Sequence, residues 1–230
     1  MRCEGREVIN RLKKAYTIKS EDFLAMEIWE KTRDPFKVLI ATILTQNTTD
    51  KGAKRAYEEL DKEVGITPER LSEADPEAIK RSIKKVGLYN NKTKILKEVS
   101  KIVSNEYGGD INKILNLDPS QARKTLVDMP GVGRKTADVV LLTCKGYSVF
   151  PVDTHIFRVS KRLGIKGGYD EISLFWRNVS DDSNLMAHLL LITHGRTICK
   201  AIKPKCDTCV LNGCCEYYAR LRGSKGSETA

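Results

Sequence analysis

Apolar residues recur along the chain with the spacing of helices. Residues 35–44 and 92–103 repeat apolar side chains every three or four positions, which indicates helices that bury one face. Asp34-Pro35 and Asp118-Pro119 are typical helix starts, because Asp caps free N–H groups and Pro fits the first position. No segment alternates as a strand would, so the sequence predicts an all-α fold with short connections.

Two further helices are expected to be buried, because residues 136–144 and 185–192 are apolar nearly all round. Residues 84–96 and 126–140 are each predicted to form a helix, a glycine-bearing turn and a second helix. Two such hairpins suggest two contacts to one extended ligand. The last residues, 223–230, are predicted to be disordered.

Length and charge narrow the class of protein. A chain of 230 residues allows one large domain or two small ones. Its 40 Lys and Arg against 30 Asp and Glu give a net charge of +10, which favours a polyanionic partner, nucleic acid before membrane. The alternative is an ordinary solvated basic surface. No apolar run could span a bilayer, and the N-terminus lacks a signal core, so we expect an intracellular protein of the reducing cytoplasm or nucleoid.

Residues 127–140, VDMPGVGRKTADVV, contain the most specific turn in the chain. Gly131 and Gly133 permit positive φ and close approach to a ligand, and the helix that follows offers N–H groups without intrahelical partners. The positive end of that helix dipole favours an anion, typically a phosphate, and Arg134 adds charge. A plain tight turn between two helices is the alternative interpretation.

Lys135 lies in the first turn of the same helix. The helix dipole and the charges of Arg134 and Lys124 disfavour its ammonium form and are expected to lower its pKa. A neutral amine is a nucleophile that can form a Schiff base, although Lys135 could also serve only to grip phosphate.

Asp153, 18 residues later, is predicted to cap a helix that begins at Thr154. A carboxylate at a helix N-terminus is expected to stay ionised. The helix from 135 to 145 rises roughly 15 Å, and the link 146–152 can span roughly 23 Å. The chain can therefore return to its starting level, so that an amine and a carboxylate face each other from two helix N-termini.

Five of the seven cysteines lie within 17 residues near the C-terminus. The odd number and the absence of an export signal argue against a disulfide framework and for a metal site. Thiolates suit zinc and iron–sulfur clusters equally well, but zinc modules more often show paired C-x-x-C units. Cys3 and Cys144 are interpreted as packed thiols, and Cys214 as a possible competing ligand.

MPGVGRKTADVVL, then VDTHIFRVSKRLGI, then a four-cysteine tail resemble the iron–sulfur branch of the helix-hairpin-helix DNA glycosylases, the family of endonuclease III. The resemblance spans about residues 28 to 216. It implies two helical domains with a DNA cleft between them. A six-helix domain would cover 31–147, with the helix-hairpin-helix at about 119–145, and a cluster domain would join 1–30 to 148–230.

The resemblance also implies an activity. A damaged pyrimidine is flipped out of duplex DNA, the residue matching Lys135 attacks C1′ of the sugar, and the residue matching Asp153 assists. An imine remains, and β-elimination breaks the strand 3′ to the lesion. The sequence thus predicts a monomeric bifunctional DNA glycosylase/AP lyase acting on oxidised pyrimidines in base excision repair.

Several DNA contacts follow from the same resemblance. The hairpin would hold a phosphate through Gly131, Val132, Gly133 and Arg134. Leu88 matches an apolar residue that wedges into the duplex, although a leucine in a loop could also simply pack against its neighbours. His155 matches a residue that lines the gap left by the flipped base. In LTQNTTD, Asn47 stands at the gap-filling position where the family has Gln, and Gln46 beside it could take over.

The cysteine spacing matches the family's [4Fe–4S] site, which implies Cys199, Cys206, Cys209 and Cys215 as ligands. Its first loop carries Lys200, Lys203 and Lys205, which are expected to face phosphate.

Two alternative functions differ from this one in the residues that they require. A monofunctional mismatch glycosylase of the same family, removing adenine or thymine, would not carry Lys135. A non-catalytic DNA-binding module would not need Asp153.

Overall fold

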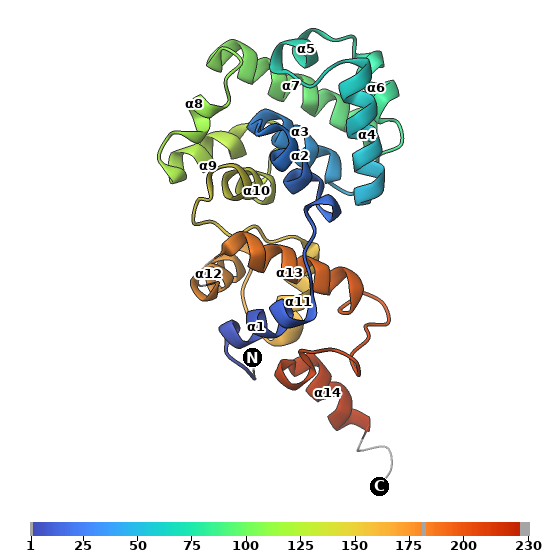
Figure 1. The fold of residues 1–230 in the computed structure, drawn as a ribbon, viewed down its shortest axis with the longest axis vertical. Coiled ribbons are helices and arrows are strands. Elements are labelled where there is room, and N and C mark those ends of the chain that lie inside the picture. Colours follow the sequence, from blue (N-terminus) through green and yellow to red (C-terminus); the bar gives the residue numbers. More distant parts are fainter. Residues whose placement is uncertain (1, 181–182, 226–230) are drawn as a thin grey trace. The chain divides into compact units, whose positions relative to one another are not determined.

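Helices and connecting loops make up the described part of the chain. The structure, a computed structural model, describes residues 2–180 and 183–225, and no strand occurs among them, which confirms the predicted all-α class (Figure 1). The chain divides into two compact units. The terminal unit runs up to Ile18 and resumes at Ser148, and the central unit is Lys19–Tyr147.

The central unit begins with a short 3₁₀ turn, Ser20–Asp22, and contains α2 to α10. Their bounds are Leu24–Thr32 (α2), Pro35–Thr45 (α3), Asp50–Glu63 (α4), Pro68–Glu73 (α5), Pro76–Ile83 (α6), Tyr89–Tyr107 (α7), Asn112–Leu115 (α8), Pro119–Asp128 (α9) and Arg134–Lys145 (α10). Residues 19–30 were expected in the cluster domain. They belong to the central unit because α2 packs against α3, α4 and α10.

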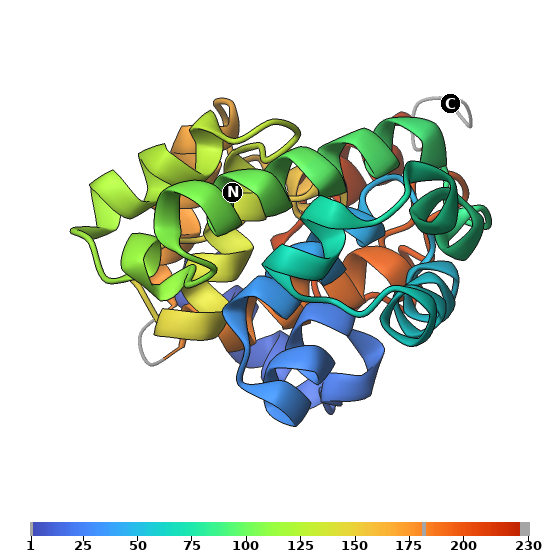
Figure 2. The ribbon, with the colours of Figure 1, turned by 90° about the horizontal axis from the view of Figure 1, so that it is seen from above.

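The core of the central unit is built around α3. Every residue of this helix from Pro35 to Leu44 except Lys37 is buried, and α2, α4, α7 and α10 pack around it (Figure 1). Seen from above, α7 is the long green helix that runs beside the teal α5 (Figure 2). The predicted caps of Asp34 and Asp118 are confirmed, because their carboxylates accept backbone N–H bonds in the first turns of α3 and α9.

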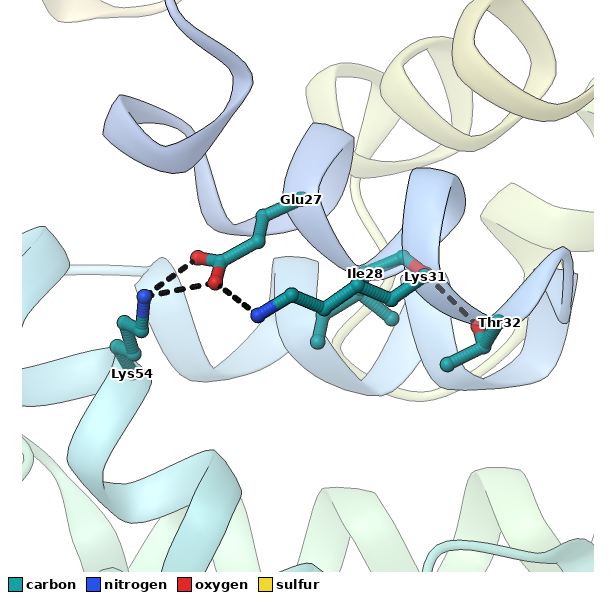
Figure 3. A network of polar contacts seen from close by, with 5 residues as sticks. All are labelled: Glu27, Ile28, Lys31, Thr32 and Lys54. Carbon is teal, nitrogen blue, oxygen red and sulfur yellow. Dashed lines mark hydrogen bonds and ion pairs between the residues drawn. The ribbon is translucent and has the colours of Figure 1, made fainter.

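Glu27 on α2 is a buried carboxylate held by two lysines. The Nζ of Lys31 lies 2.5 Å from its Oε1, and the Nζ of Lys54 on α4 lies 2.7 Å and 2.9 Å from its two oxygens (Figure 3). Burial alone would raise the pKa of the Glu27 carboxyl, but the hydrogen bonds from the two lysines hold its pKa below the ordinary value. The ion pair between Glu27 and Lys54 therefore links α2 to α4.

We expect Glu27→Gln to lower the free energy of unfolding by about 2 kcal/mol at pH 7, because two charge-assisted hydrogen bonds weaken. Since the folded-state pKa is lowered, this contribution is complete above the ordinary pKa and is lost as the pH falls through the lowered one. Urea unfolding of both proteins between pH 7 and pH 3 should show the gap closing in acid. Glu98→Gln, which breaks an exposed pair with Lys101, is the control and should change stability by less than about 0.5 kcal/mol. If the difference in unfolding free energy between the wild type and Glu27→Gln did not change with pH, the ionised Glu27 would not be its cause.

The terminal unit joins the two ends of the chain. It contains α1 (Gly5–Ala15), α11 (Thr154–Leu163), α12 (Tyr169–Val179), α13 (Asn184–Thr197), a short 3₁₀ turn (Asn212–Cys214) and α14 (Glu216–Lys225). The largely buried α13 contacts α1, α11 and α12. Trp176 is fully buried and donates its Nε1–H to Ser160 Oγ at 2.8 Å.

The C-terminal residues continue the last helix further than the sequence predicted. Residues 223–225, predicted to be disordered, form the end of α14, and residues 226–230 lie outside the described residues. None of the helices in residues 2–180 and 183–225 is long and apolar enough to cross a membrane.

Candidate functional site

The glycine turn between α9 and α10 packs against α7. Gly131 has φ = 71°, as the sequence predicted, and a Cβ added there would lie 2.4 Å from Ile95 Cδ1. Only glycine meets both conditions, since a side chain would be strained in this conformation and would collide with Ile95. The hairpin therefore packs against α7, which comes earlier in the chain.

Gly133 does not use the positive φ that glycine permits. Its backbone is extended (φ −82°, ψ 172°). It is the N-cap of α10, and a Cβ there would meet no atom within 4 Å. Open space in front of a helix N-terminus leaves room for an anion at the first N–H groups.

The residues beside Gly133 present different groups to that space. The side chain of Val132 is 2% exposed, so only its backbone can take part in a contact. Arg134 is exposed at the first position of α10, and the half-buried Lys135 follows it. This order places a guanidinium and an amine in the first turn of one helix.

Gln46 is bonded to the hairpin by its side chain. Its Nε2 donates to Gly131 O and to Thr136 Oγ1, both at 3.1 Å. Thr136 directly follows Lys135 and is buried. The amide of Gln46 is therefore committed to holding the turn that carries Lys135.

Asn47 and Leu88 lie on two loops that contact each other. Asn47 is exposed and has φ = 50°, and Leu88 is 62% exposed with φ = 59°. A Cβ on Gly87 would lie 2.7 Å from Asn47 O, so the two backbones touch at a position where only glycine fits. Two non-glycine residues in the left-handed region at one place are strained, and such strain concentrates at functional sites.

Lys92 lies beneath these loops and was not among the predicted site residues. Its side chain is 1% exposed, and burial lowers its pKa to about 8. Its burial could have been predicted from the sequence, because Lys92 lies on the same helix face as the apolar residues 95, 96 and 99.

Asp153 and His155 occupy the N-terminus of α11 in the terminal unit. Asp153 Oδ1 accepts the Ile156 N–H at 2.8 Å, which confirms the predicted cap. Arg158 Nη2 lies 3.0 Å from His155 Nδ1, and because arginine can only donate, Nδ1 accepts this bond. In a neutral His155 ring the proton is therefore on Nε2.

The four predicted ligand cysteines line one cavity of the terminal unit. Cys199, Cys206, Cys209 and Cys215 share its wall with apolar residues such as Val159, Leu163 and Leu211. Burial raises the pKa of the Cys209 thiol to about 11, so a thiolate there needs a cationic partner, which a metal supplies. Two donors already point at the sulfurs: Arg162 Nη1 is 3.3 Å from Cys199 Sγ, and Leu211 N is 3.4 Å from Cys209 Sγ.

The separation of the four sulfurs tests which metal group fits. A tetrahedral zinc ion would bring them to about 3.8 Å from one another. Within the described residues, no three of these four thiols have their sulfur atoms all within 4.8 Å. In every set of three of these thiols, at least one separation between two sulfur atoms is therefore wider than in a tetrahedral zinc site.

Cys3 and Cys214 form a disulfide, with their Cα atoms 5.0 Å apart. The interpretation of Cys3 as a packed thiol was therefore wrong. The two residues are 211 positions apart, and tertiary contacts such as Arg11 Nη1 to Val210 O (3.2 Å) bring them together, so spacing could not reveal the pair. The bond also removes Cys214 from competition with Cys215 as a ligand.

The loop between Cys199 and Cys206 is basic, and its backbone is hydrogen-bonded to Arg162. Lys200, Lys203 and Lys205 are all exposed. Arg162 on α11 donates to Lys200 O at 2.7 Å and to Ala201 O at 3.1 Å, which fixes the backbone of the loop. The three charges are thus presented to solvent from a held segment.

Comparisons with known proteins agree on one family. The family of HhH-GPD superfamily base excision DNA repair proteins matches residues 40–173. Endonuclease III of Sulfolobus acidocaldarius is 41% identical over 219 residues, 93% of this chain and 96% of the relative, and endonuclease III of Escherichia coli is 36% identical over 81% and 86%. A trapped covalent intermediate of an endonuclease III with DNA has a TM-score of 0.73 at 26% identity and covers 90% of this chain and 100% of that one. A thermostable thymine-DNA glycosylase has a TM-score of 0.69, also at 26% identity, and covers 94% and 97%.

Proposed function

Since the chain belongs to the endonuclease III family of DNA glycosylases/AP lyases, which act in base excision repair, we propose that it excises oxidised pyrimidines from duplex DNA through Lys135 and Asp153. The observation that carries this proposal is the place of Lys135, in the first turn of a helix whose N-terminus has open space in front of it for a phosphate. A lysine there serves both DNA binding and nucleophilic attack.

The reaction proceeds through base removal, ring opening, β-elimination and hydrolysis of the imine. The Lys135 amine attacks C1′, the bond from C1′ to the base breaks, and the base leaves with the bonding electrons and takes up a proton. The sugar ring opens to an imine between C1′ and Nζ. Loss of a C2′ proton then expels the 3′ phosphate, and water releases the lysine. The Asp153 carboxylate would stabilise positive charge on the sugar in the first step.

The nearest rival function is a mismatch glycosylase of the same superfamily, since a thymine-DNA glycosylase is among the similar structures. That function requires no amine nucleophile, whereas Lys135 supplies one. Duplexes carrying either thymine glycol or a T·G mismatch, incubated with the protein under borohydride, separate the two. We expect excision and a covalent adduct on the first duplex. Excision from the mismatch alone, without an adduct, would overturn the proposal.

The DNA contacts divide between the two units. The backbone at Gly131, Val132 and Gly133 with Arg134 would hold a phosphate, and the loop lysines 200, 203 and 205 would bind the backbone elsewhere. Leu88 would enter the stack as an apolar wedge. Asn47, rather than Gln46, would face the orphaned base, because the Gln46 side chain is bonded to the hairpin. His155 would line the same gap.

We further propose that Cys199, Cys206, Cys209 and Cys215 hold a [4Fe–4S] cluster. Support comes from their common cavity and from sulfur separations wider than in a tetrahedral zinc site. The cluster supplies a positively charged cross-link between thiolates, which keeps the basic loop in place. The proposed role is structural, and it positions the lysines of that loop.

Cys206→Ser should lose most of the protein's iron and its brown colour, because one of four thiolate ligands is removed. Iron analysis and the visible absorption of freshly purified protein measure this. The matched control is Cys144→Ser, which changes a thiol on α10 in the central unit and should keep both signals. A Cys206→Ser protein with full iron content and colour would refute the ligand assignment.

A further inference from the structure

Lys92 makes three contacts through its Nζ, all to the segment that carries Asn47. The acceptors are Leu44 O at 2.9 Å, Gln46 O at 2.5 Å and Thr48 Oγ1 at 2.9 Å. These partners stand on both sides of Asn47, and all are uncharged oxygen atoms. Burying a lysine without a carboxylate partner costs stability, which points to a role for Lys92 other than packing.

The bonding capacity of the amine matches its surroundings. An ammonium group has three N–H donors, and three oxygens receive them. Since burial lowers the pKa only to about 8, most molecules hold the charged form at pH 7. Each of the three oxygens is therefore fixed to one buried point, and Asn47 is held between them in its left-handed conformation.

The same helix face supports the other contact loops. Lys92 and Ile95 are three residues apart and share one buried face near the start of α7, and Leu88 is the N-cap of this helix. Leu88 O accepts the Lys92 N–H at 2.9 Å, and Ile95 packs under Gly131 of the hairpin. The loops of Leu88 and Asn47 and the glycine hairpin are thus all seated on about the first two turns of α7.

We propose that Lys92 is a positioning residue that holds Asn47 directly, and Leu88 through the contact of Gly87 with Asn47 O, in the conformations in which these two residues, here called the reading edge, enter the duplex. This inference rests on the proposed function, since it assumes that these two side chains fill the site of the flipped base. Lys92 touches no DNA in this role. It removes the cost of ordering two strained loops at the moment of base flipping.

The principal test compares Lys92→Met with Lys97→Met. Methionine keeps the length of the side chain but removes the three donors. Lys97 is the matched control, because it is also on α7 and its Nζ also donates to a backbone carbonyl, that of Ala74, away from the reading edge. We expect Lys92→Met to slow single-turnover excision of thymine glycol by about 10- to 100-fold, and Lys97→Met by less than about twofold.

A second substrate separates positioning from general damage. A duplex with a ready-made abasic site has no base to unstack, so Lys92→Met should lose less than about threefold in borohydride trapping on it. With 2-aminopurine opposite that site, the wild type should raise the fluorescence and Lys92→Met should raise it much less. Equal losses on both substrates, or behaviour like that of Lys97→Met, would overturn the inference.

A double mutant shows whether Lys92 acts through the edge. If it does, Leu88→Ala should cost much less in the Lys92→Met background than in the wild type. Fully additive losses would contradict the proposal. If Lys92→Met does not fold, Thr48→Val removes one acceptor at constant volume and should show the same substrate pattern to a smaller degree, whereas wild-type behaviour would count against the role.

The failure of this inference is distinguishable from failure of the proposed function. If the wild type does not excise thymine glycol, the substrate assignment fails, but the 2-aminopurine measurement on the abasic duplex still compares the two lysine variants. If the wild type excises it and both variants match the wild type, only the positioning role fails.

Discussion

Lys135→Ala is expected to abolish the covalent adduct that borohydride traps on a thymine glycol duplex. Without the amine no imine forms, so strand cleavage should fall by about 10³-fold or more, as expected when a nucleophile is deleted. DNA affinity should change much less, because the substitution leaves in place the hairpin backbone and Arg134, which are proposed to hold the phosphate. Denaturing gels of the trapped reaction and a binding titration measure the two effects separately.

Two controls isolate the amine from its charge. Lys135→Arg keeps a positive charge in the first turn of α10 but cannot form an imine, so it should bind DNA and give no adduct. Lys101→Ala removes a charge from α7, where Lys101 pairs with Glu98 at the surface, and should leave trapping within about twofold. An adduct of normal yield with Lys135→Ala would assign the nucleophile to another residue.

Asp153→Asn is expected to slow base removal by about 10²- to 10³-fold, because a neutral amide cannot stabilise the positive sugar. The substitution is well matched to the structure. Asn caps helices as well as Asp does, so the bond from Ile156 N should persist and the fold should be unchanged. Single-turnover excision rates at saturating protein measure the chemical step.

The control for this prediction is Asp34→Asn, the same change at the N-cap of α3. It should leave excision within about twofold. For Asp153→Asn, DNA binding should stay near the wild-type value while excision falls. If Asp153→Asn turns over at the wild-type rate, the carboxylate has no part in the chemistry and is only a cap.

Local signals predicted much of this fold. The Asp-Pro starts at residues 34 and 118, the cap at Asp153 and the buried helices around 136–144 and 185–192 depend on interactions within a few residues, and all appear in the structure. The glycine turn was predicted for the same reason, but only Gly131 takes a positive φ. Both glycines looked alike in sequence, and contact with Ile95 from α7 distinguishes them.

The features that sequence did not predict depend on contacts between distant segments. Cys3 and Cys214 pair across 211 positions. The choice between Gln46 and Asn47 was open in the sequence, and the bonds from Gln46 to residues 131 and 136, which support the proposal for Asn47, join distant segments. Lys92 was missed because a lysine among apolar positions has no obvious partner until residues 44–48 are folded against it.

The bond between Cys3 and Cys214 also determines how the molecule carries mechanical force. Tension applied to the two ends of the chain passes through this covalent bridge, so the central unit, which lies wholly inside the bridged loop, bears no load. In an optical trap the oxidised protein should extend only by its short terminal segments. Reduction should release the remaining 211 positions, a gain of about 700 Å in contour length. The glycine hairpin, which lies in the central unit, is thus shielded from pulling until the disulfide opens.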